Sequence, residues 1–300
     1  MAVADTSPAD GPAGAEPELP PGRMVELPGR GRTFVRDLAG PAGARRLPLV
    51  LLHGWSVTAD LNFFACYRPL ADQGRRVVAL DHRGHGRGIR PFGGRVRLSD
   101  CADDAAALLD MLGIERAIVL GYSMGGPIAQ LTWRRHHDRV AGLVLCATSA
   151  DFTSGPAAEL RYRAFGGLGL VATVAPLPAT NLFHRMIEQR VGDGPMVDWM
   201  RGELQRGSPA GLLSSLGSLG RFRADDWIGE VDVPTSVVRM TEDQTVSPRR
   251  QARLAELVPG AERFDVAGPH DVCATNPRRF VPVLLDAVAS VDRRTAPKRR

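Results

Sequence analysis

Lysine is almost absent from this sequence, since Lys298 is the only one and arginine supplies the remaining basic side chains. The body of the chain has no long block of basic residues. Five positive charges, equal in number to the formal net charge of +5, gather near the end of the chain at Arg293, Arg294, Lys298, Arg299 and Arg300. A nucleic-acid-binding protein concentrates its positive charge in a patch or stripe on the folded domain. We therefore expect a small-molecule partner and no nucleic acid.

Cysteine is also scarce, and the four residues are widely separated: Cys66, Cys101, Cys146 and Cys273. No C-x-x-C pair or zinc-ligand spacing occurs, so the sequence indicates neither a disulfide framework nor a structural zinc site. Isolated cysteines of this kind are typical of buried free thiols in a reducing compartment. The expected location is the cytoplasm, and no metal is expected.

Signal-peptide and membrane-span patterns are missing as well. Residues 1–22 combine Pro and Gly with scattered acidic residues and lack a basic or apolar leader, so we expect a disordered acidic tail. Residues 164–183 carry no formal charge and reach the length of a membrane span. Several Gly and Pro residues interrupt that stretch, however. We therefore expect an apolar element of a cap over a pocket, and no integral membrane span.

What the sequence does contain is a regular alternation of strand-like and helix-like segments. After two short strands at Met24–Leu27 and Arg32–Leu38, near-continuous apolar runs predict six buried strands at Leu47–Leu52, Arg76–Leu80, Ala117–Leu120, Val140–Cys146, Thr235–Met240 and Arg263–Val266. Helical patterns begin at Ser99, Pro127, Ser247 and Asn276. Strands that alternate with helices predict an α/β fold with a mostly parallel central sheet flanked by helices.

The alternation stops between residues 151 and 227, where no clear strand pattern occurs. We interpret this stretch as a helical cap inserted into the α/β core. The predicted organisation is a tail at 1–22, a core formed by 23–150 and 228–292, the cap at 151–227, and a basic tail at 293–300.

The motif with the clearest chemical meaning is Gly121–Gly126, GYSMGG, which fits G-x-S-x-G. A strand pattern precedes it and a helix pattern with Pro127 in the first turn follows it. This is the context of a nucleophile elbow, in which glycines permit a sharp turn and expose the serine. Ser123 is therefore the candidate nucleophile. An oxyanion hole would use the backbone N–H of Met124 and that of Trp55, which follows the strand ending before His53-Gly54.

An acid and a base are expected after the serine, in that order along the chain. Asp243 follows one predicted strand and His270 follows the next, both at the carboxyl edge of the sheet. Asp243 is the candidate acid, with Glu242 as an alternative one residue away. His270 is the candidate general base, with His184 in the cap as a weaker alternative.

Two further histidine motifs allow a chemical and a structural interpretation. His53 could act as a base, but we favour a histidine that shapes its loop through hydrogen bonds. The segment Asp81–Gly86, DHRGHG, could suggest a metal site, but no further ligands stand at a recognisable spacing. We therefore also predict a loop-shaping role for this segment.

Taken together, these motifs resemble the α/β-hydrolase fold superfamily, in particular its cap-bearing bacterial serine hydrolases of the esterase and lipase type. The likeness rests on six sequence features: His53–Trp55, Asp81–Gly86, Gly121–Gly126, Arg139–Leu145, Asp243 with Pro248, and Gly268–Asp271. It spans residues 23–291. One departure is Thr241-Glu242, where relatives often carry a glycine.

The resemblance implies a Ser123–His270–Asp243 catalytic triad that cleaves an ester-type bond of a small, apolar substrate without a cofactor. Trp55, Met124 and the uncharged stretch 164–183 would supply apolar walls. The same triad would serve a carbon–carbon bond hydrolase, a thioesterase, an acyltransferase or a cofactor-free haloperoxidase-like enzyme. A non-catalytic ligand-binding protein is the alternative from another class. The oligomeric state is left open.

Overall fold

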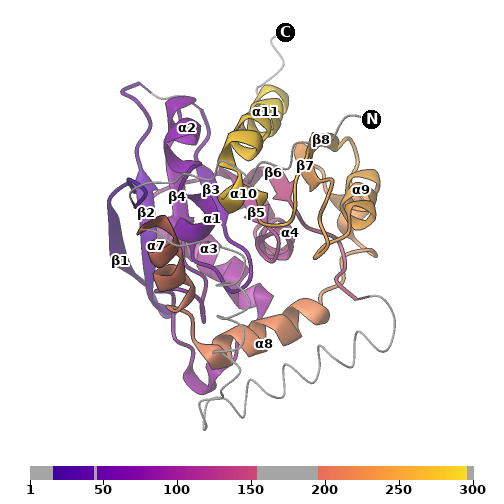
Figure 1. Cartoon of the computed structure of the whole chain (residues 1–300). Helices are drawn as coiled ribbons and strands as arrows, with labels where there is room; N and C mark the ends of the chain where they lie inside the picture. The colour runs from indigo at the N-terminus through magenta and orange to yellow at the C-terminus, as the bar shows by residue number, and fades with distance from the viewer. Residues whose placement is uncertain (1–15, 44–45, 154–194, 296–300) are drawn as a thin grey trace, which may run out of the picture.

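The computed structural model describes residues 16–43, 46–153 and 195–295 (Figure 1). Within them one eight-stranded sheet has the order β1-β2-β4-β3-β5-β6-β7-β8. The strands are β1 Gly22–Leu27, β2 Gly31–Leu38, β3 Leu49–Leu52, β4 Val77–Leu80, β5 Ala117–Tyr122, β6 Val140–Cys146, β7 Thr235–Met240 and β8 Glu262–Val266. The pairs β1–β2 and β2–β4 are antiparallel, and the remaining strands run parallel. The predicted α/β class with a mostly parallel sheet is confirmed.

The strands follow from the apolar runs in the sequence, and their bounds differ from the predicted ones by two residues at most. The first two strands form a hairpin in which Leu27 pairs with Gly31, and Gly29 adopts a φ of 69° in the turn. In β3, Val50 and Leu52 pack on one face of the sheet whereas Leu49 and Leu51 pack on the other. Both faces are therefore buried, which explains why the inner strands show no polar alternation.

Helices cover both faces of the sheet. Their bounds are α1 Ala59–Phe63, α2 Tyr67–Asp72, α3 Leu98–Met111, α4 Gly125–Arg135, α7 Pro195–Leu204, α8 Pro209–Gly220, α9 Pro248–Leu257, α10 Val272–Thr275 and α11 Pro277–Thr295. The helices α3, α4 and α9 contribute to one hydrophobic core, and α1, α2, α10 and α11 contribute to the other. The expected helices α3, α4, α9 and α11 are confirmed. The short helices α1, α2 and α10 were not predicted, since none spans two full turns.

The part of the predicted cap that the structure describes contains α7 and α8. Residues at its two ends meet, because Asp151 forms an antiparallel bridge with Arg223 and the Ala224 N–H donates to the Ala150 carbonyl. The division at 151 and 227 stays a prediction, and the uncharged stretch 164–183 lies outside the described residues. At the C-terminus, α11 continues to Thr295. The first three residues of the predicted basic tail, 293–295, are therefore helical, and the division at 293 stays a prediction.

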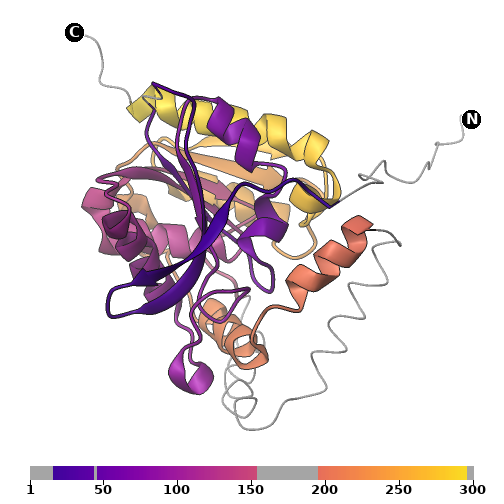
Figure 2. The same ribbon diagram turned by 90° about the vertical axis from the view of Figure 1, so that its left-hand side faces the viewer.

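Two serine side chains of helix α8 accept hydrogen bonds from backbone N–H groups of the core. Ser214 and Ser218, four residues apart on one helical face, accept the N–H groups of Val96 and Leu98. Gly211 lies so close to the core that a Cβ there would be 2.6 Å from the Cα of Gly84. Figure 2 shows α8 far from α11, at the other side of the molecule.

All four cysteines are free and buried, as predicted. Among the residues that the structure describes, no helix is both long and apolar enough to cross a membrane.

The two cap helices offer a matched test of this packing. We expect Gly211→Ala to destabilise the protein by about 1–3 kcal/mol, because the methyl group would meet the Gly84 backbone. Gly202 in α7 is exposed, and a Cβ there meets nothing within 4 Å. Gly202→Ala should stabilise by up to about 1 kcal/mol through helix propensity. Urea unfolding of both variants measures the effect, and equal changes of one sign would contradict the close contact.

Candidate active site

The candidate residues lie in loops that follow parallel strands, at one edge of the sheet. His53 follows β3, Ser123 follows β5, the Asp243 loop follows β7 and the His270 loop follows β8. Because parallel strands end at the same edge, residues far apart in sequence come together there. In the order of the sheet, β5, which leads to Ser123, lies near the centre. The strand β3, which leads to His53, lies on one side of it, and β7 and β8, which lead to the Asp243 and His270 loops, lie on the other.

Ser123 occupies a sharp turn between β5 and α4. Its φ of 53° lies in the left-handed region, which non-glycine residues adopt at a cost. A Cβ at Gly121 would lie 2.2 Å from the Gly125 carbonyl oxygen, and one at Gly125 would lie 2.0 Å from that of Leu52. Only glycine fits at these two positions. The glycines of the motif therefore let the turn pack directly against the end of β3.

His270 connects the serine to the acid. Its Nε2 lies 2.9 Å from Ser123 Oγ, and its Nδ1 lies 2.7 Å from Asp243 Oδ2. Since a carboxylate only accepts hydrogen bonds, Nδ1–H donates to Asp243 and Nε2 can accept the serine proton. The hydroxyl of Tyr122 donates to the His270 carbonyl over 2.6 Å. The residue before the serine thus also holds the histidine loop.

Asp243 is buried and receives hydrogen bonds at both carboxylate oxygens. Besides His270, the donors are the N–H groups of Thr245 and Val246 and the Gln251 side-chain amide, at 2.7, 2.9 and 2.9 Å. The alternative acid, Glu242, is exposed, and its N–H donates to the Gly268 carbonyl. The structure therefore brings together Ser123, His270 and Asp243, with Glu242 outside this set.

The loop after β3 passes beside the serine. A Cβ on Gly54 would lie 3.3 Å from Ser123 Cβ. The candidate donor Trp55 follows Gly54, and its indole N–H donates to the Leu212 carbonyl of α8. The other candidate donor, Met124, stands at the N-cap of α4. Met124 as a whole is buried, and its side chain packs in the hydrophobic core, which does not support the expectation that it lines an apolar pocket.

Three buried histidines lie behind that loop. His53 donates from Nδ1 to the Gly54 carbonyl at 2.8 Å and accepts the His82 N–H at Nε2 over 2.9 Å. The ring of His82 lies 4.3 Å and that of His85 5.5 Å from the His53 ring. Burial lowers the pKa of His53 to about 4 and that of His85 to about 3. His53 is therefore neutral, with one nitrogen donating and one accepting.

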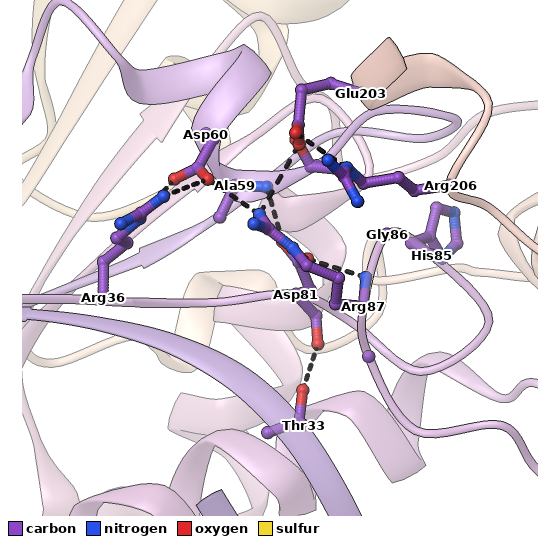
Figure 3. A network of polar contacts seen from close by, with 12 residues as sticks. Thr33, Arg36, Ala59, Asp60, Asp81, His85, Gly86, Arg87, Glu203 and Arg206 are labelled. Atoms are coloured by element: carbon purple, nitrogen blue, oxygen red, sulfur yellow. Dashed lines mark hydrogen bonds and ion pairs between the residues drawn. The ribbon is translucent and has the colours of Figure 1, made fainter. Parts of the chain in front are cut away.

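The Asp81–Gly86 segment forms a tight loop held by its aspartate (Figure 3). Asp81 accepts the N–H groups of Ala59 and Arg87, at 2.9 and 2.8 Å. Burial raises the pKa of the Asp81 carboxyl, although the Arg87 guanidinium opposes this shift. These contacts support the loop-shaping interpretation. Within the described part of the chain, no group of three or more His, Cys, Asp or Glu residues could hold a metal ion.

A network of charged side chains, whose carboxylates are buried, continues from this loop to the cap helix α7 (Figure 3). Arg87 donates to Asp60 at 2.7 Å and lies 3.5 Å from Glu203 of α7. Glu203 also accepts hydrogen bonds from Thr58 at 2.7 Å and from Arg206 at 2.8 Å. Sequence reasoning missed this network, because no sequence pattern shows which charged residues far apart in the chain are buried together.

Two other residues beside the candidate site were also missed. Gln251, fully buried, holds Asp243 and is recognisable as a polar residue on the apolar face of α9 beside Leu254. Asn62, also buried, accepts the Gly54 N–H at 2.8 Å and stands as a polar residue within an apolar stretch. The alternative base His184 lies outside the described residues.

Known proteins resemble this chain over most of its length. A family model of the alpha/beta hydrolase fold matches residues 48–183. A relative from Mycobacterium phage D29, provisionally named a non-heme haloperoxidase, is 32% identical over 77% of this chain and 83% of its own. A non-heme chloroperoxidase from Streptomyces lividans is 28% identical over 81% and 92% of the two chains. The solved structure of an esterase from Exiguobacterium antarcticum superposes with a TM-score of 0.73, covering 89% and 98% at 20% identity.

The fold, the strand-turn-helix motif and these relatives agree on one class of protein. The chain belongs to the α/β-hydrolase superfamily and is a hydrolase. The esterase structure, at its low identity, supports the fold alone.

The neutral, buried His53 predicts a pH dependence of stability. The unfolded chain binds a proton at His53 near pH 6.5, whereas the folded protein does so near pH 4. Stability from this group is complete above pH 6.5 and is lost as pH falls towards 4, with about 2 kcal/mol lost by pH 5. Urea unfolding at pH 7.5 and pH 5 should show a smaller loss in His53→Asn than in wild type.

The matched control is the exposed His137, whose Nε2 lies 2.9 Å from Asp232 Oδ1 at the surface. His137→Asn should retain the wild-type difference between the two pH values within about 0.5 kcal/mol. A His53→Asn variant that loses as much stability as wild type would contradict the assignment.

Proposed function

We propose that this hydrolase is a serine esterase that acts on a small, apolar substrate through an acyl-enzyme. The observation that carries the proposal is the continuous hydrogen-bonded series from Ser123 Oγ through His270 to Asp243, at 2.9 and 2.7 Å. A nucleophile bonded to a base that is itself oriented by an acid defines this chemistry, irrespective of position in the sequence.

In the proposed reaction, Ser123 Oγ attacks the ester carbonyl carbon while His270 Nε2 takes the hydroxyl proton. Asp243 keeps Nδ1 protonated and stabilises the imidazolium that forms. The imidazolium then gives its proton to the leaving alkoxide oxygen, and an acyl-serine remains. Water attacks this ester in the same way, with His270 again as base, and releases the carboxylic acid. No metal or organic cofactor enters these steps.

The negative oxygen of the tetrahedral intermediate would be held by the N–H groups of Trp55 and Met124. Met124 precedes α4, whose N-terminus favours negative charge. Removing one donor of an oxyanion hole costs about 3–4 kcal/mol in known hydrolases. The closeness of Gly54 to Ser123 supports the assignment of the Trp55 loop.

The apolar substrate is proposed from the sequence, because the uncharged stretch 164–183 lies outside the described residues. Trp55 supports it, since this half-buried aromatic residue joins the serine site to the cap helix α8. The proposed location in the cytoplasm is supported by the four buried free thiols.

The names of two relatives favour a second candidate, a haloperoxidase-like activity on the same acyl-enzyme. Hydrogen peroxide would replace water, attack the acyl carbonyl and release a peroxycarboxylic acid while His270 returns the proton to Ser123. The peroxy acid then oxidises bromide to hypobromous acid and is reduced to the carboxylic acid. Bromination of a β-diketone that requires acetate, peroxide and bromide together, and is lost in Ser123→Ala, would favour this candidate over simple hydrolysis.

Ser123 provides the direct test of the esterase proposal. We expect a fluorophosphonate probe to label Ser123, because hydrogen bonding to His270 activates the hydroxyl. Mass spectrometry should find the probe on the peptide containing Ser123, and p-nitrophenyl acetate should be hydrolysed by wild type only. Undiminished labelling and turnover in Ser123→Ala would overturn the proposal.

The acid can be tested with two neighbouring substitutions. Asp243→Asn should lower kcat by about 10⁴-fold, because an amide supports the wrong imidazole tautomer. Glu242→Gln should change kcat less than about threefold, since this side chain is exposed and His270 Nδ1 bonds to Asp243 instead. Steady-state kinetics on p-nitrophenyl esters compare the two. A larger loss in Glu242→Gln would show that the acid is misassigned.

A further inference from the structure

We propose that Asn62 is a positioning residue that fixes the distance between two segments: the oxyanion loop, His53–Trp55, and the histidine loop, His270–Cys273. The proposal rests on the proposed function, since it assigns a role within that reaction. Asn62 stands in α1, outside the elements that carry the three candidate catalytic side chains, and it is only 5% exposed. A buried amide is costly unless its polar atoms are bonded.

Both polar atoms of the Asn62 amide form hydrogen bonds, one with the oxyanion loop and one with the histidine loop. Oδ1 accepts the Gly54 N–H at 2.8 Å, and Nδ2 donates to Cys273 Sγ at 3.2 Å. A backbone N–H can only donate, so this contact fixes which end of the amide faces Gly54. Gly54 lies against Ser123, and Cys273 is three residues beyond His270. One side chain therefore spans the two loops that must meet at the reacting carbonyl.

The contact with Gly54 also determines which N–H groups can face a substrate. Asn62 holds the peptide between His53 and Gly54, because the Gly54 N–H points to its Oδ1. His53 holds the next peptide, because its Nδ1 bonds to the Gly54 carbonyl. In a trans peptide the N–H points opposite to the carbonyl. The direction of the Trp55 N–H is thereby fixed by Asn62 and His53 on successive peptides.

The histidine loop is held at two points. Tyr122, adjacent to the serine, donates to the His270 carbonyl, and Asn62 donates to Cys273. The short helix α10, which contains Cys273, also packs against α1. Loss of Asn62 would leave the bond from Tyr122 to the His270 carbonyl intact. It would remove only the hydrogen bond that holds the histidine loop at Cys273.

The expected effect is on the chemical step. We expect Asn62→Ala to lower kcat for p-nitrophenyl acetate by about 10²-fold and to change KM by less than about threefold, because donors displaced by about 1 Å lose much of their effect. The loss should be larger for the ester than for the matching thionoester, whose sulfur an oxyanion hole binds poorly. A side chain with a merely structural role would lower both rates equally.

Cys273 supplies a second, independent set of variants. Cys273→Ala removes the acceptor for Asn62 and should lower kcat by about tenfold, whereas Cys273→Ser retains an acceptor and should recover most of it. The double variant Asn62→Ala/Cys273→Ala should be no slower than Asn62→Ala alone, because one connection is broken in both. These variants keep the test available if Asn62→Ala does not fold.

Asn276→Ala is the matched control. Asn276 lies three residues after Cys273, and its side chain accepts the Arg279 N–H at the start of α11, whereas Gly54 and Cys273 bond to Asn62. It should lose stability yet keep kcat within about twofold. Equal ester and thionoester losses in Asn62→Ala, an unchanged kcat, or additive effects in the double variant would overturn the positioning role. Absence of Ser123-dependent turnover in wild type would instead overturn the proposed function.

Discussion

The close approach of the Ser123 turn to the end of β3 is the constraint on which the candidate site depends. Gly125 packs against the Leu52 carbonyl so tightly that no side chain fits between them. This contact joins the start of α4 to the strand that leads into His53 and Gly54. The serine and the loop beside it are therefore placed by backbone packing between neighbouring parallel strands. Side chains then refine a geometry that the main chain has already set.

Each remaining loop of the site is held by a side chain from a different element. Gln251 of α9 holds Asp243, Tyr122 of β5 holds the His270 loop, and Asn62 of α1 holds Gly54. All three are buried, so water does not compete for their hydrogen bonds. Donors and acceptors fixed in this way need little reorganisation when charge develops at a substrate. The loops carry the candidate catalytic residues, whereas the helices and strands beneath them hold those loops in place.

The sequence contained enough information to predict the strands and to name Ser123, Asp243 and His270 as candidates, because these features are local. Apolar runs and a G-x-S-x-G turn can be recognised without knowing any partner. The positioning residues could not be recognised in this way, since Asn62 and Cys273 are 211 residues apart and meet only through the fold. Glu242 stayed an alternative to Asp243 for the same reason: burial and the contact with His270 distinguish them, and neither is visible in a loop sequence. Helices α1, α2 and α10 were missed because so few residues give no measurable periodicity.

The buried network at α7 shows a further kind of information that sequence patterns do not carry. This helix buries Glu203 and Leu204, and its Trp199 packs edge-on against Phe64 at the end of α1, so its contact combines a charged side chain with apolar ones. Three carboxylates, Asp60, Asp81 and Glu203, meet three guanidinium groups, Arg36, Arg87 and Arg206, and the formal charges balance (Figure 3). Desolvation offsets most of the attraction in such buried pairs, so their net contribution to stability is small. Their hydrogen bonds are directional, and those of Glu203 connect α7 to Thr58 and Arg87 of the core. The same loop that Asp81 shapes beside the histidines thus also fixes where this part of the cap sits on the core.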